Sequence, residues 1–375
     1  MRGLGFSIEP WAFTLARELA GLFAVEDWQV LNGTVRFRGR LLTDPESAMR
    51  LLTPRVEPLG FVPMIQSPRE ITLLRLPAAS RRAPQGWRGW PLNLALFLTT
   101  VVTTVLVGTG SDLLVLTMAG AHASWHNLTD PAKLLEGAWY SASLLFILGF
   151  HELGHYVTAR AYGVQVSLPY FVPLPLWPMG TMGAIIRMRS PIPSRKVLFD
   201  IGIAGPLLGL VVVLPVLVVG LILSPVQPVA GVVFQEGNSL AYLFLKWVIK
   251  GPIPDGSDVM LHPMALAGWL GLFVTALNLM PLSQLDGGHI AYAVLGPRFR
   301  KAVWVFLAVL VGLFLVSHWE GWLVWVGLAV ALGLRHPPPL DDLTPLDRTR
   351  RQVAVAALGL LIALVTPLPF AIYEL

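Results

Sequence analysis

Residues 143–160 read SLLFILGFHELGHYVTAR, an apolar run interrupted by two histidines and a glutamate. Residues four apart on an α-helix lie on one face, separated by about 6 Å along the axis. His151 and His155 have this spacing, so both imidazoles can bind one Zn²⁺ at about 2.0–2.1 Å. Glu152 cannot easily bind the same ion, but it can hydrogen-bond a water on the metal and act as a general base. The pattern therefore predicts a helix that carries a hydrolytic zinc site.

The alternative is a pair of core histidines with satisfied hydrogen bonds and an incidental glutamate. The composition argues against it, because the chain is 55% hydrophobic and 13% charged, with a mean hydropathy of +0.66. These values are typical of a polytopic membrane protein and exclude an ordinary soluble enzyme. A charged group inside a membrane helix costs at least ~2.5 kcal/mol. Three polar groups on one apolar turn therefore need a common reason, and a metal supplies it.

Cysteine is absent from the chain, so a metal must be bound by histidine, aspartate or glutamate. The net charge is +5. In a membrane protein such an excess of basic residues sets the topology, and we do not expect a nucleic-acid partner.

Residues 1–89 are predicted to form a small soluble α+β domain, and residues 90–375 a membrane-embedded domain. In the first domain, strict alternation over 33–42 predicts a half-buried strand, with Val35 and Phe37 facing inward and arginines outward. The other elements expected there are helices over 11–25 and 45–53 and strands over 61–65 and 71–76.

The second domain is predicted to be a bundle of about seven transmembrane helices. They are expected over residues 91–108, 135–161, 197–223, 261–281, 301–317, 320–334 and 352–370. Basic residues collect on one side of this topology if the N-terminus is cytosolic and the C-terminus lies outside. Residues 109–134 are expected to be a loop, and residues 240–249 a short interfacial helix.

Residues 162–196 are expected to re-enter the membrane near the active site. Prolines at 169, 173, 175 and 178 forbid a helix, and residues 180–188 are predicted to be an extended strand. Backbone without helical hydrogen bonds is tolerated at membrane depth only where it is buried in protein or lines a wet cavity. This segment can therefore border the metal site.

A catalytic zinc site usually has three protein ligands, and several residues compete for the third position. Asp286 is the best candidate, because the two glycines that follow it allow close backbone approach. Asp200 and His289 are rivals; His289 is better explained as a hydrogen-bond donor to a ligand or as an interfacial residue. Glu136 is fifteen residues before His151, about 22 Å along a helix, and cannot reach the ion.

The chain resembles the site-2 protease family, the intramembrane zinc metalloproteases. The resemblance covers about residues 90–370. It depends on three motifs: His151-Glu152-Leu153-Gly154-His155, Ala204-Gly205-Pro206-Leu207, and Asn278-Leu279-Met280-Pro281 leading to Leu285-Asp286-Gly287-Gly288. It implies that Asp286 is the third zinc ligand and that Asn278 helps to hold the substrate or its oxyanion. The subgroup that looks most similar is that of plastid and bacterial members typified by plant yellow-green gravitropism proteins, here without PDZ or CBS domains.

The resemblance implies proteolysis within transmembrane segments of membrane-protein substrates, after an earlier cut by another protease. Zinc, one ion per chain, would activate a water and Glu152 would be the general base. The substrate is expected to unwind and to be captured by strand addition on the extended segment. The residues proposed for that contact are Gly180, Gly183, Ala184, Ile185 and Ile186.

The chain is expected to lie in the lipid bilayer of a bacterial inner membrane, with a plastid membrane as the less favoured location. Two other functions stay open. One is a membrane metal transporter or sensor, which needs polar residues along a continuous path. The other is a catalytically inactive relative that acts as a scaffold.

Overall fold

The computed structural model describes residues 10–31, 33–75, 89–111, 126–175, 179–228, 232–282, 284–332 and 334–374. The chain forms two compact units, which are described separately. The first unit contains Met1–Gly86, Ser190–Leu198 and Pro337–Arg348, and the second contains Trp87–Arg189, Phe199–His336 and Thr349–Leu375. The first unit thus includes two later segments that a division of the chain at residue 89 leaves out.

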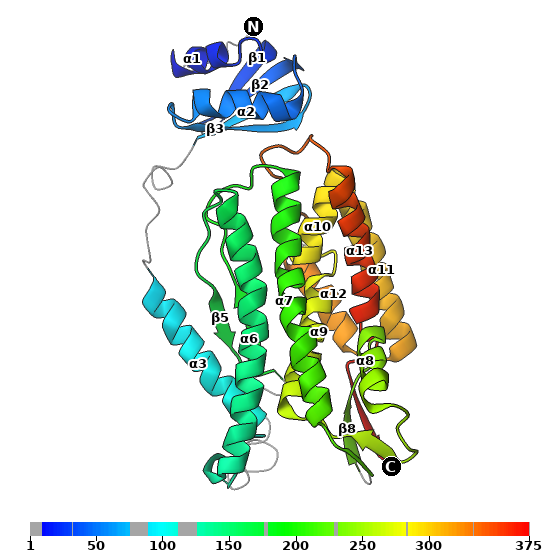
Figure 1. Cartoon of the computed structure of the whole chain (residues 1–375). Helices are drawn as coiled ribbons and strands as arrows, with labels where there is room; N and C mark the ends of the chain where they lie inside the picture. Colours follow the sequence, from blue (N-terminus) through cyan, green and yellow to red (C-terminus); the bar gives the residue numbers. More distant parts are fainter. Residues whose placement is uncertain are drawn as a thin grey trace. The chain divides into compact units, whose positions relative to one another are not determined.

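Where the structure describes it, the first unit is an antiparallel sheet with two helices, which confirms the predicted α+β region (Figure 1). The strands lie in the order β1-β2-β4-β3. The elements are α1 Pro10–Glu18, β1 Phe23–Leu31, β2 Thr34–Leu41, α2 Pro45–Val56, β3 Phe61–Ser67 and β4 Glu70–Arg75. Segment 340–342 joins the edge of this sheet, because Ile65 N–H donates to the Leu340 carbonyl at 2.8 Å.

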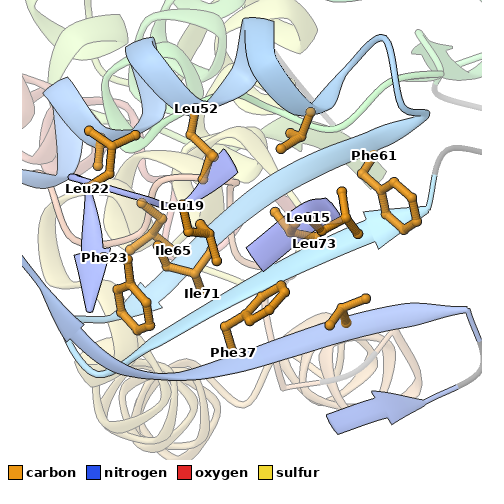
Figure 2. Packing of buried hydrophobic residues seen from close by; sticks show 13 residues of the cluster. Leu15, Leu19, Leu22, Phe23, Phe37, Leu52, Phe61, Ile65, Ile71 and Leu73 are labelled. Carbon is orange, nitrogen blue, oxygen red and sulfur yellow. The ribbon is translucent and has the colours of Figure 1, made fainter. Parts of the chain in front are cut away.

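The core of this unit lies between the sheet and its helices (Figure 2). Val35 and Phe37 of β2 are fully buried, as the alternation predicts, and Leu52 of α2 packs with them. Asp44 caps α2 by accepting a hydrogen bond from Ser47 N–H at 2.8 Å. This bond holds the pKa of Asp44 below its usual value.

The helix predicted over residues 11–25 is wrong in its second half. The helix α1 ends at Glu18, and a turn with Gly21 at φ +78° leads into β1. Phe23 begins this strand and is buried in the core. β1 pairs with β2 from Phe23 to Leu31 with an irregularity between Val25 and Asp27, so a tertiary contact outweighs the local helical pattern.

In its described residues, the second unit is a bundle of helices with three small two-stranded sheets (Figure 1). Its helices are α3 Trp90–Gly108, α6 Pro131–Ala161, α7 Arg195–Leu223, α8 Leu240–Lys250, α9 Pro263–Asn278, α10 Asp286–Leu295, α11 Phe299–Ser317, α12 Gly321–Leu332 and α13 Arg348–Leu364, with a 3₁₀ turn at Gly296–Arg298. The strands pair as β5 Tyr170–Pro173 with β6 Thr181–Ile185, β7 Val226–Pro228 with β9 Ser257–Val259, and β8 Val232–Glu236 with β10 Phe370–Glu374. The helix α6 packs against α3 and α9.

Three segments among the described residues are long and apolar enough to cross a membrane. They are Trp90–Gly108, Arg195–Leu223 and Asp286–Ser317. Each of the seven predicted spans coincides largely with a helix, but α9, with 16 residues, and α12, with 12, are shorter than a full bilayer span. The count of seven is therefore not confirmed.

Several predicted helix boundaries differ from the structure. The helix α9 ends at Asn278, before Pro281, and an unpredicted helix α10 begins at Asp286. The last helix ends at Leu364, because the prolines at 367 and 369 cannot continue it, and the chain then forms β10. Residues 180–188 are extended as predicted, with β6 over Thr181–Ile185. Most of the predicted 109–134 loop, residues 112–125, and Leu76 lie outside the described residues.

Candidate metal centre

The two histidines lie on one buried face of α6. His151 is 5% exposed and His155 is 6% exposed. Their Nε2 atoms are 3.2 Å apart, and their rings meet edge to face with centroids 4.9 Å apart. The four-residue spacing therefore directs both Nε2 atoms toward the same point.

Asp286 reaches this point from α10, 135 residues further along the chain. Its Oδ2 atom lies 3.1 Å from His151 Nε2, and its Oδ1 atom lies 3.1 Å from His155 Nε2. Its side chain is 13% exposed. Among the described residues these three form the one group of histidines and acids that could hold a metal ion.

The spacing of these donors fits a zinc ion. Tetrahedral ligands at about 2.0–2.1 Å from the metal are about 3.3–3.4 Å from each other. The observed separations of 3.1–3.2 Å come close to this value. Two neutral imidazoles and one carboxylate also match the donor types of catalytic zinc sites, which leave a fourth position open.

The orientation of the His155 ring is fixed by α7. Its Nδ1–H group donates to the Ile201 carbonyl at 2.7 Å. This bond selects the tautomer whose Nε2 atom carries a free lone pair, directed at the other two donors. Ile201 could not be predicted from the sequence, because a backbone carbonyl leaves no signal in residue identity.

The helix α7 approaches the histidines without side chains in between. A Cβ atom on Gly205 would lie 2.1 Å from His155 Nε2, and one on Gly209 would lie 3.2 Å from His151 Nδ1. On the facing helix, a Cβ on Gly154 would lie 2.4 Å from the Ala204 carbonyl oxygen. Only glycine permits this contact, so the Ala204-Gly205-Pro206-Leu207 motif serves the packing around the metal ligands.

Glu152 is buried beside the three donors. It is 6% exposed, and the backbone N–H of Ile186 is close enough to act on its carboxylate. Ile186 directly follows β6, so the extended segment lies against the candidate base as predicted for a border of the site.

The sheet of β5 and β6 is held against α3. Thr103 Oγ1 donates to the Gly180 carbonyl at 2.7 Å, and Ala184 pairs with Phe171 of β5. Met182 and Ile185 are 69% and 58% exposed. Within the described residues β6 pairs with β5 alone, so its other edge has no strand partner.

Asn278 is the last residue of α9. Its Nδ2 atom lies 3.4 Å from His151 Nε2. An amide donor is therefore present beside the donor cluster, on the element that precedes Asp286 in the chain.

Comparison with known families gives one match. The model of peptidase family M50 matches residues 139–317. This segment of the chain is therefore similar to a peptidase family M50 domain. The segment contains all three candidate ligands together with Glu152 and Asn278.

The curated relatives that the chain matches include plant proteins. "Probable zinc metalloprotease EGY2, chloroplastic" from Oryza sativa subsp. indica is 31% identical over 249 residues, which are 64% of this chain and 45% of the relative. "Probable zinc metalloprotease EGY1, chloroplastic" from Arabidopsis thaliana is 32% identical over 60% of this chain and 42% of its own length. Arabidopsis EGY2 is 27% identical over 93% of this chain and 63% of its own length. The chain thus spans about half the length of these relatives, and no solved structure matches it.

The three rival ligands predicted from the sequence are engaged elsewhere. Asp200 accepts a bidentate pair of hydrogen bonds from Arg350 and a third from the Tyr162 hydroxyl. His289 Nδ1 lies 2.6 Å from His336 Nε2, and Glu136 is paired with Lys133 at 2.7 Å. None of the three rivals belongs to the donor cluster.

Proposed function

We propose that the protein is an intramembrane zinc metalloprotease that hydrolyses peptide bonds in the transmembrane segments of other membrane proteins. The observation that carries this proposal is the buried cluster of His151, His155 and Asp286 with Glu152 at its side. The match to peptidase family M50 and the names of the plant relatives support the same activity.

His151, His155 and Asp286 would hold the zinc ion. When bound, zinc lowers the pKa of a water molecule and polarises a peptide carbonyl group. Hydrolysis then adds the hydroxyl group of water to the carbonyl carbon, breaks the C–N bond and delivers a proton to the leaving amine. Glu152 accepts the proton of the water and returns it to the amine nitrogen, which is the role of a general base that becomes a general acid.

Asn278 is proposed to stabilise the oxyanion. Negative charge develops on the substrate carbonyl oxygen when water attacks, and a fixed amide N–H group stabilises this charge. The position of Nδ2 next to His151 supports this role, because an attacked carbonyl would lie beside the residues that would hold the ion.

The substrate is proposed to bind as an added strand beside β6. A helical substrate exposes no free carbonyl group, so it must first become extended. The unpaired edge of β6 offers backbone hydrogen bonds to such a strand. A strand bound along this edge would lie next to the base, because Ile186 at the end of the segment is beside Glu152. The proposed contact residues are Gly180, Gly183, Ala184, Ile185 and Ile186.

The protein is proposed to be an integral membrane protein. The names of the plant relatives point to a plastid membrane rather than to the bacterial inner membrane that we predict from the sequence. The choice between these membranes stays a prediction, as do the cytosolic N-terminus and an earlier cut in the substrate.

The decisive experiment compares two glutamates of α6. Glu152→Gln should retain zinc, measured by mass spectrometry, and should lose cleavage of transmembrane reporters in proteoliposomes. Glu136→Gln is the matched control, because Glu136 lies on the same helix with a 43% exposed side chain. It should retain both zinc and cleavage. Normal cleavage by the Glu152 variant would refute the assignment of the base.

The same preparation tests the other two functions. Zinc flux into vesicles without reporter cleavage would indicate a transporter. Full zinc content without cleavage of any reporter and without flux would indicate a scaffold.

A further inference from the structure

The short helix α8 has the reverse of the polarity expected for a helix at a water surface. Lys246, in the middle of the helix, is 6% exposed, and Tyr242 is fully buried. Its large apolar side chains point outward with exposures of 45–64%. The apolar face of α8 consists of Leu240, Leu243, Phe244, Trp247 and Val248, which follow the i, i+3, i+4, i+7, i+8 spacing of one helix side.

The inner face of α8 is fixed by a polar network. Lys246 Nζ donates to Glu236 Oε1 at 2.9 Å, and the Tyr242 hydroxyl donates to the same oxygen at 2.7 Å. Asp258 lies 3.6 Å from Lys246 and accepts a hydrogen bond from Gln235 at 2.8 Å. Rotation of α8 would leave a buried ammonium group and carboxylates without partners, which is strongly unfavourable. The outward direction of the apolar face is therefore built into the fold.

The apolar face of α8 continues a surface that is suited to lipid. Lys250, at the end of α8, donates to the Ile222 carbonyl at the end of α7 at 3.3 Å. Ile222 and Leu223 are themselves 62% and 52% exposed, and α7 is one of the three segments able to cross a membrane. The helix α8 lies near the end of α7 and near β8 (Figure 1).

Ionisable residues of membrane proteins face the protein interior, and apolar residues face the acyl chains. Eleven residues of α-helix are about 16 Å long, which is about half the ~30 Å thickness of the hydrocarbon core. We propose that the apolar face of α8 lies in one leaflet of the bilayer, so that α8 is a lipid-facing half-span rather than a cap in water. Its partner is thus the acyl chains of that leaflet.

The absence of cysteine allows a direct test in the full chain, because each introduced cysteine is unique. Phe244→Cys and Val248→Cys would be spin-labelled and reconstituted into phosphatidylcholine vesicles. Two reference labels bracket the result: Leu98→Cys on the exposed side of α3, a candidate span, and Arg40→Cys on the exposed side of β2. Power saturation then compares accessibility to oxygen, which dissolves in lipid, with accessibility to a water-soluble nickel complex.

The labels at 244 and 248 should behave like the label at 98, with high oxygen accessibility and loss of nickel accessibility relative to residue 40. Nickel accessibility equal to that of residue 40 would place the face in water and overturn the proposal. Low accessibility to both reagents would mean that protein covers the face, such as a second copy of the chain, and would also overturn it.

Discussion

The substitution Gly205→Ala tests whether the bare surface of α7 sets the positions of the metal ligands. An alanine Cβ at this position would lie 2.1 Å from His155 Nε2 and 2.5 Å from the two adjoining ring carbons. This is about 1.4 Å closer than the ~3.5 Å at which non-bonded heavy atoms attract each other. The atom displaced is the nitrogen that is proposed to bind the metal, so the conflict falls on the ligand itself.

The ring of His155 cannot retreat freely. Its Nδ1–H bond to Ile201 holds it against the same helix that carries the new methyl group. Metal–ligand distances tolerate only about ±0.2 Å, so a displacement near 1 Å should break the coordination. We expect zinc affinity to fall by at least the 10–100-fold that is typical when the support of a ligand is lost.

Two other glycines give a graded control for this substitution. Gly209→Ala places a Cβ 3.2 Å from His151 Nδ1, which a small shift of the ring relieves, so its effect should be weaker. Gly149→Ala meets no atom within 4 Å and should leave zinc affinity unchanged. Alanine is about 1 kcal/mol more favourable than glycine in a helix interior, so propensity alone cannot cause a loss.

The assay is competition for zinc between the purified protein and a chelator, with a thermal melt of the metal-free protein beside it. The expected order of affinity is wild type and Gly149→Ala, then Gly209→Ala, then Gly205→Ala. Wild-type affinity in a folded Gly205→Ala protein would refute the reasoning.

Three further outcomes are expected. Asp286→Ala should lower zinc content below one ion per chain, and unchanged content would move the third ligand elsewhere. Asn278→Ala should keep zinc but lower reporter turnover by about 10²–10³-fold, the usual effect of removing one oxyanion donor; a loss of zinc instead would show a role in binding the metal. Phe37→Ala should destabilise the first unit by about 3–5 kcal/mol, seen as faster hydrogen exchange in β2 and β4, whereas unchanged exchange would contradict its place in the core.

The parts of the site that were predictable from sequence are those in which spacing alone decides direction. The interval between His151 and His155 predicts convergence on one helix face, and the structure brings their Nε2 atoms to 3.2 Å. The alternation around Val35 and Phe37 similarly predicts which side of β2 is buried. Within one helix or strand, the spacing of residues determines which side their side chains face, so this direction can be predicted without knowing the tertiary contacts.

The parts that were not predictable depend on contacts between distant segments. Asp286 could be ranked above Asp200, but its place beside the histidines depends on how α10 packs, and that helix was not predicted at all. Ile201 acts through its carbonyl oxygen, which every residue has. The strands β1 and β10 form because partners at β2 and β8 complete their hydrogen bonds, and no local pattern contains that information.

The charges of the candidate site give a separate reason for a cation there. Glu152 and Asp286 bring two carboxylates into one largely buried cluster. Two buried carboxylates repel each other and lose hydration, and neutral imidazoles do not compensate this cost. A divalent ion bound by His151, His155 and Asp286 would offset the negative charge while it leaves Glu152 free to accept a proton. The carboxylates of Asp286 and Glu152 would therefore serve metal binding and proton transfer in the same cluster, which fits a base that lies one residue from the first ligand.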